Sequence, residues 1–225
     1  QMHRLGKWQQ RIRVHSSRDR RLSNVLGRVS EICQSCSLPK NVIETASIIY
    51  RSLDEKNIKV KGKSVMSISA AVVYMACKKC DVVRSLDEIL KEVCQPREIK
   101  SKRKLASKYY RTLVMELGTV TVPTVTMDKY ISKIANMTNT DTRVERLSLE
   151  IAEKTKDRSI ADGKAPNGIA AAYLYIGSIL LGQNVLQRDV STVAGVTEVT
   201  IRNRCKEILT SFKLSISLRP SLAKK

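Results

Sequence analysis

Basic and polar side chains near the C-terminus are the residues best suited to chemistry in this sequence, and their pattern predicts contact with DNA. The stretch 187–209, QRDVSTVAGVTEVTIRNRCKEIL, has the pattern of a helix-turn-helix. One helix ends at Ala194, Gly195 supplies the tight turn, and Thr197 caps the second helix. Helical spacing predicts that Val196, Ile201, Ile208 and Leu209 face the core, and that Glu198, Val199, Arg202, Asn203 and Lys206 face outward.

The outward residues divide by the contacts that their side chains can make. Arg202 can donate two hydrogen bonds to a guanine, and Val199 can touch a thymine methyl group, so these two are the candidate base-reading residues. Thr197, Asn203 and Lys206 are candidate contacts to the DNA backbone. The alternative is a solvated basic helix surface, because helix pairs joined by a glycine turn are common in all-α proteins.

Two C-x-x-C pairs, Cys33 with Cys36 and Cys77 with Cys80, could suggest a zinc site. Both pairs fall within predicted helices rather than in glycine-rich turns, and Cys77 lies in a strongly apolar segment. We therefore expect buried free thiols and no metal site. A disulfide and structural zinc remain the alternatives.

The composition favours a nucleic-acid partner and argues against catalysis. Lys and Arg total 41 against 21 acidic residues, giving a net charge of +20 that attracts polyanions. The only two histidines, His3 and His15, lie in the basic N-terminal arm, and the chain has no GxSxG, HExxH or GxGxxG motif. No enzymatic activity is expected. No apolar run is long enough for a membrane span, and none resembles a secretory signal.

An internal repeat at an offset of 101 residues organises the chain. Gly62, Lys63, Ile68, Ala70, Ala71 and Tyr74 recur as Gly163, Lys164, Ile169, Ala171, Ala172 and Tyr175. Each copy centres on a segment that is apolar nearly all round, which predicts a central helix surrounded by others. The apolar period predicts helices over 20–36, 40–55, 64–80, 85–93 and 104–117, and again over 126–137, 141–155, 165–181, 186–194 and 197–213. The sequence thus predicts an all-α fold of two five-helix domains.

The first copy has six more residues than the second just before its last helix. They fall within 96–104, PREIKSKRK, which we expect to form a basic loop. Lys100, Lys102, Arg103 and Lys104 would contact DNA phosphates there without reading bases. The alternative is a solvated loop that binds nothing.

Three of these features together resemble archaeal transcription factor B, the counterpart of eukaryotic TFIIB, over essentially the whole chain. They are the arm QMHRLGKWQQRIRV, the doubled GKxxxxIxAAxxY helix and the terminal AGVTEVTIRNRCKEIL. The resemblance implies two cyclin-like five-helix domains, the second ending in the helix-turn-helix. It also implies that the protein clamps TATA-binding protein (TBP) on promoter DNA and helps to recruit RNA polymerase.

The resemblance also implies roles for particular residues. Val199 and Arg202 would face the bases of the B-recognition element upstream of TATA. The arm, with Trp8, Arg11 and Arg13, would run along the polymerase clamp near the melting DNA. The first repeat would contact the stirrup of TBP and the DNA backbone downstream. A factor of this kind would work in the archaeal cytoplasm, associated with the nucleoid.

Two departures from the family pattern stand out. The family's zinc ribbon and reader loop are expected before Gln1, so zinc is expected only there and no cofactor within these 225 residues. The basic insertion at 96–104 is atypical and points to a divergent paralogue. The competing hypothesis is a cyclin-like adaptor that binds a protein such as a kinase and never touches DNA.

The predicted organisation has five parts. They are a basic linker arm at 1–19, the first repeat at 20–117, an interdomain linker at 118–125, the second repeat at 126–214 and a tail at 215–225.

Overall fold

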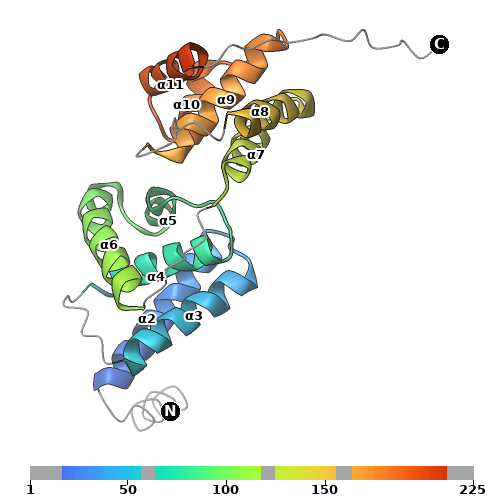
Figure 1. Cartoon of the computed structure of the whole chain (residues 1–225). Helices are drawn as coiled ribbons and strands as arrows, with labels where there is room; N and C mark the ends of the chain where they lie inside the picture. The colour runs from blue at the N-terminus through green and yellow to red at the C-terminus, as the bar shows by residue number, and fades with distance from the viewer. Residues whose placement is uncertain (1–16, 57–63, 118–124, 156–163, 212–225) are drawn as a thin grey trace. The chain divides into compact units, whose positions relative to one another are not determined.

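The computed structural model describes residues 17–56, 64–117, 125–155 and 164–211, and every regular element within these ranges is an α-helix (Figure 1). The all-α prediction is confirmed. The chain divides into two compact units between Val125 and Thr126. The first unit holds α2 (Ser17–Ser35), α3 (Lys40–Glu55), α4 (Val65–Lys79), α5 (Leu86–Val93) and α6 (Pro96–Glu116). The second holds α7 (Met127–Met137), α8 (Thr142–Lys154), α9 (Pro166–Leu180), α10 (Gln187–Ala194) and α11 (Glu198–Ser211).

A central helix organises each unit, as the apolar segments predict. Helix α4 contacts the other four described helices of the first unit, and α9 does the same in the second. In α4, ten of the eleven residues from Ser67 to Cys77 are buried. In α9, ten of the eleven residues from Gly168 to Ser178 are buried. Their small side chains let the neighbouring helices approach closely, and burial of their apolar surface stabilises each unit.

The internal repeat extends to the turns that join the helices. Ser37, after α2, and Asn139, after α7, both have positive φ, at 50° and 48°. In each case the next amide donates back to a carbonyl near the end of the helix, Leu38 N to Cys33 O at 2.8 Å and Thr140 N to Ala135 O at 3.0 Å. Asp81 and Gly182 repeat this arrangement after α4 and α9.

The prediction of a loop at 96–104 is wrong, because α6 begins at Pro96 and continues to Glu116. Proline suits the first turn of a helix, and Gln95 before it is extended. Ile99, Leu105 and Ala106 continue the apolar period toward the core, so these residues belong to the same helix. The six extra residues therefore lengthen α6 relative to α11 and do not form a loop.

Several predicted segments lie outside the described residues. They include the arm with Trp8, Arg11 and Arg13, almost all of the linker at 118–125, and the tail. The boundaries of the five predicted parts stay predictions. Among the described helices, none combines the length and the apolar composition that crossing a bilayer requires.

Gly177 marks a close approach of α8 to α9 and allows a test of this packing. A Cβ there would lie 3.2 Å from the carbonyl oxygen of Val144 and would overlap Ser148 Oγ, which donates to that carbonyl at 2.7 Å. Gly177→Ala should therefore lower the free energy of unfolding by about 1–3 kcal/mol, measured by urea denaturation. Ser148→Ala should recover part of the loss.

The matched control is Gly27→Ala, on the exposed side of α2, where an added Cβ meets nothing within 4 Å. That change should stabilise its helix by about 0.5–1 kcal/mol, because alanine is the better helix former. Destabilisation by Gly27→Ala as large as that by Gly177→Ala would contradict the assignment of a close approach.

Candidate nucleic-acid interface

The turn between α10 and α11 is built as the sequence predicts. Helix α10 ends at Ala194, and Gly195 follows in the left-handed conformation with φ 66° and ψ 33°. Thr197 caps α11, since its Oγ1 accepts a hydrogen bond from Thr200 N at 3.2 Å. A residue with a side chain rarely adopts the conformation of Gly195, so this glycine sets the direction in which α11 leaves the turn.

Four of the five residues predicted to face outward on α11 form one exposed row. Val199 is 57% exposed, and Arg202, Asn203 and Lys206 are also exposed, at positions i, i+3, i+4 and i+7 of the helix. No ion pair joins Arg202 or Lys206 to another of the described residues. We call these four residues the α11 face. The row presents two cations and an amide beside an apolar side chain, a combination that can contact base edges in a major groove.

The opposite side of α11 is held in the core. Ile201 and Ile208 are completely buried, and Val196 in the turn packs against the same core, as predicted. Leu209 was predicted to face the core, and this is wrong because the residue is 51% exposed. It follows Ile208 by one position, which rotates its side chain about 100° away from the buried side. Glu198 is only partly exposed.

A second basic surface runs along α6. Its members are exposed and recur every three or four residues, so they share one side of the helix: Arg97, Lys100, Lys104, Lys108 and Arg111. None of them forms an ion pair with another described residue. From Arg97 to Arg111 the row is about 21 Å long at 1.5 Å per residue. We call this row the α6 ridge.

The four residues predicted to contact phosphates near 96–104 lie on different sides of α6. Lys100 and Lys104 belong to the α6 ridge, together with three cations that the prediction missed. Arg103 turns away and pairs with Asp87 of α5, Nε to Oδ1 at 3.2 Å. Lys102 is partly buried on the far side of α6. The helical period from Arg97 to Arg111 was the signal that could have identified the ridge.

The cysteines are free thiols, and those of the two C-x-x-C pairs lie in or beside the first core. Burial raises the pKa of Cys33 to about 11, with Cys36 adding to the effect. Burial, together with the neighbouring Cys33, Cys36 and Cys80, raises the pKa of Cys77 to about 12. Within the described ranges, no His, Cys, Asp and Glu side chains converge in threes as metal ligands would. That these thiols hold no zinc stays a prediction.

Comparison with known proteins shows which family model this sequence matches. Residues 18–104 and 120–211 match the model described as the transcription factor TFIIB repeat. The chain is 40% identical over 218 residues to proteins named transcription initiation factor IIB from Methanoculleus marisnigri and from Archaeoglobus fulgidus. The match covers 97% of this chain and 62% and 64% of those relatives, so the chain spans less than two thirds of their length.

Among solved structures, the chain is similar to one chain of the yeast RNA Pol II CTD kinase CTDK-1 complex, with a TM-score of 0.37 and 16% sequence identity. The match covers 86% of this chain and 65% of that chain. A likeness of this degree carries no inference about function.

The raised thiol pKa values predict slow alkylation of the folded protein. Because only the thiolate reacts and a raised pKa lowers its fraction, Cys33 and Cys77 should label at least tenfold more slowly at pH 8 than in urea. Labelling of Cys77 should still accelerate between pH 8 and pH 10. Mass spectrometry after timed iodoacetamide treatment measures both effects.

Cys80 is the internal control, because it lies three residues from Cys77 at the end of the same helix but is only partly buried. It should label before Cys77. Metal analysis of the same sample should find well under one zinc per chain. A stoichiometric zinc that protects the four thiols would contradict this description of the first core.

Proposed function

This chain belongs to the transcription factor TFIIB repeat family, and on that premise we propose that it binds promoter DNA together with TBP as a transcription initiation factor. Members of the family are non-enzymatic factors, which agrees with the lack of a catalytic motif in the sequence. The two repeats are cyclin-like five-helix units, and the second ends in a helix-turn-helix.

The single observation that carries the proposal is the α11 face. Val199, Arg202, Asn203 and Lys206 stand exposed in one row on the helix that follows a glycine turn. In this arrangement Arg202 donates to a guanine and Val199 contacts a thymine methyl group, while Asn203 and Lys206 bind flanking phosphates. Thr197, exposed at the start of α11, lies where a helix N-terminus approaches the DNA backbone. The element read in this way lies upstream of TATA.

The α6 ridge supplies affinity without reading sequence. Its five cations have no carboxylate partner among the described residues and lie in a row about 21 Å long, and each cation that neutralises a phosphate releases condensed counterions. Because the side chains are long and exposed, they can follow the backbone of any sequence. This role replaces that of the basic loop expected at 96–104. Lys100 and Lys104 remain proposed phosphate contacts, and Lys102 and Arg103 do not.

RNA polymerase is the third proposed partner, contacted by the N-terminal arm with Trp8, Arg11 and Arg13. The site of action would be the archaeal cytoplasm, at the nucleoid. The net charge of +20 and the exposed cations of the α11 face favour this function over a cyclin-like adaptor that binds only protein, because they attract a polyanion. The experiment below distinguishes the two functions.

A gel shift on a TATA promoter tests the proposal. With TBP present, the chain should form a ternary complex that is more stable on DNA carrying a matched upstream element than on DNA with that element scrambled. Since a bidentate base contact is worth about 1–3 kcal/mol, Arg202→Ala should weaken the matched complex about five- to 150-fold and change the scrambled complex little. Equal loss on both DNAs would assign Arg202 to a phosphate. No TBP-dependent shift at all would favour the adaptor.

The α6 ridge predicts a change in salt dependence. Lys100→Ser with Lys104→Ser should make the slope of log K against log salt shallower by up to about 2, because each phosphate contact contributes about 0.9. The matched control is Lys102→Ser with Arg103→Ser, which removes the same charge from the same helix off the ridge. If both pairs shift the slope equally, only net charge matters and the ridge is not a contact surface.

A further inference from the structure

The start of α9 and the residues just before it touch the helix-turn-helix at three places. Asn167 Nδ2 donates a hydrogen bond to the carbonyl oxygen of Ala194, at the end of α10, at 3.1 Å. A Cβ on Gly168 would lie 3.3 Å from Thr200 Cγ2, so the glycine allows the first turn of α11 to lie against α9. Lys164 Nζ lies 2.9 Å from Glu207 Oε2.

Two of these contacts fall on one flank of α11. Thr200 and Glu207 are seven residues apart, which is two helical turns and about 10 Å along the axis. Their side of the helix lies between the buried Ile201 and Ile208 and the exposed α11 face. Burial of the two isoleucines holds α11 against the core, and the flank contacts restrict its rotation about its own axis. Asn167 fixes the turn from which the helix starts.

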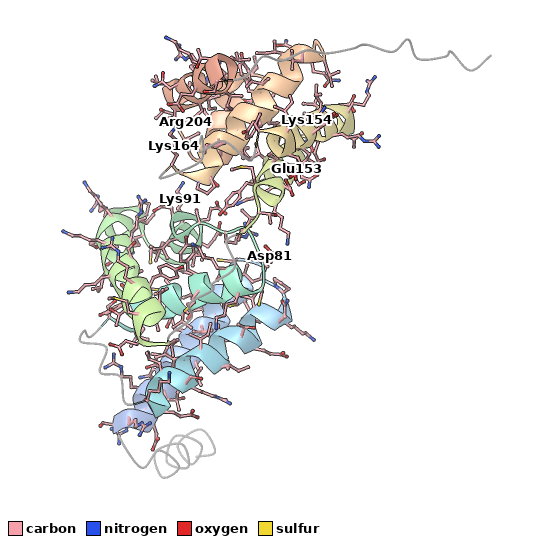
Figure 2. All side chains as sticks on the ribbon, in the orientation of Figure 1. Asp81, Lys91, Glu153, Lys154, Lys164 and Arg204 are labelled. Carbon is pink, nitrogen blue, oxygen red and sulfur yellow. The ribbon has the colours of Figure 1, made fainter. Side chains whose placement is uncertain are left out.

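Glu207 joins the two charged contacts on this flank of α11. Its carboxylate accepts hydrogen bonds from Lys164 and from Arg204, which is one turn earlier on α11. These two hydrogen bonds lower the pKa of Glu207 below its ordinary value, so the carboxylate is charged at neutral pH. Figure 2 labels the two cations, Lys164 and Arg204, in the second unit. Both are bonded to Glu207 and are partly buried, whereas the cations of the α11 face are exposed.

The first repeat keeps only the lysine of this arrangement, since Lys63 is the counterpart of Lys164. At the offset of 101 residues, Met66 stands in place of Asn167, and Cys94, in an extended conformation, stands in place of Gly195. At the offset of 95 residues that relates α6 to α11, Thr112 replaces Glu207 and Tyr109 replaces Arg204. The amide donor at Asn167 and the carboxylate acceptor at Glu207 therefore occur only in the repeat that presents a helix-turn-helix.

We propose that Lys164, Asn167 and Glu207 are positioning residues that set the orientation of the α11 face, and so determine base selectivity without touching DNA. This inference rests on the proposed function, because it explains part of the base selectivity of the α11 face by residues that do not belong to that face. A helix that can rotate presents Arg202 and Val199 to the bases less accurately, while its cations still reach phosphates. Loss of positioning should therefore reduce selectivity more than affinity.

Three variants separate orientation from charge, because Lys164→Met lowers the net charge by one, Glu207→Gln raises it by one, and Asn167→Ala leaves it unchanged. The measured quantity is the ratio of the TBP-dependent affinities for matched and scrambled upstream DNA. All three variants should lower this ratio about three- to tenfold, which lies within the range found for residues that act through another group. On scrambled DNA, Lys164→Met should bind more weakly than the original chain and Glu207→Gln more tightly, because nonspecific affinity follows charge.

Lys154→Met is the matched control. It breaks the ion pair of Lys154 with Glu150, at 2.6 Å on α8, and makes the same charge change as Lys164→Met at a site that is not part of the contacts made by Lys164, Asn167 and Glu207. Its ratio should stay at the original value. Thermal unfolding of each variant confirms that the fold is retained, and the three variants provide independent tests if one of them fails to fold.

A background of Arg202→Ala tests whether the effect passes through the α11 face. In that background the ratio is already low, and Lys164→Met should lower it by a smaller factor than in the original chain, since the Arg202 contact that it would misalign is already gone. A large ratio in the original chain that is unchanged in all three variants would overturn this inference alone. A ratio near one in the original chain would overturn the proposed function, and this inference with it.

Discussion

Each unit of this protein depends on a central helix that has no polar side. Helices α4 and α9 bury small and apolar residues all round, so each must be covered by four other helices before it is stable. That requirement fixes the inward residues of every surrounding helix and leaves only the outward ones free to differ. The two repeats therefore share their cores and their turns after α2, α4, α7 and α9, and differ in the surfaces that α6 and α11 present.

The difference between those surfaces begins at one backbone position. In the second repeat, Gly195 takes a left-handed conformation and starts a separate helix in a new direction after a short turn. In the first repeat, the equivalent Cys94 is extended, and Gln95 and Pro96 begin a helix of 21 residues. One arrangement exposes a short row of mixed side chains, suited to base edges. The other exposes a long row of cations, suited to a phosphate backbone.

The sequence was sufficient to predict the repeated core and the helix-turn-helix, because both depend on local signals. Gly195, Thr197 and the spacing of Ile201 and Ile208 predicted the turn, the cap and the buried side of α11. The helical state of 96–104 was missed because a surplus of residues relative to the other repeat was interpreted as a loop, although Pro96 and Ile99 carried the helical signal. The contacts of Lys164, Asn167 and Arg103 could not be predicted, because their partners are distant in the sequence.

Ion pairing divides the cations of this strongly basic chain into two groups. Arg18 bonds to Asp54, Arg103 to Asp87 and Lys164 to Glu207, and each pair joins two helices or a helix and the segment before one. Exposed pairs of this kind contribute little to stability, but they hold a side chain in one place. The cations of the α11 face and the α6 ridge have no such partner among the described residues, and they stay free to meet phosphates or bases. In the proposed complex, pairing with a carboxylate would weaken the attraction of these cations to DNA, so the positions of the acidic residues would also influence the affinity.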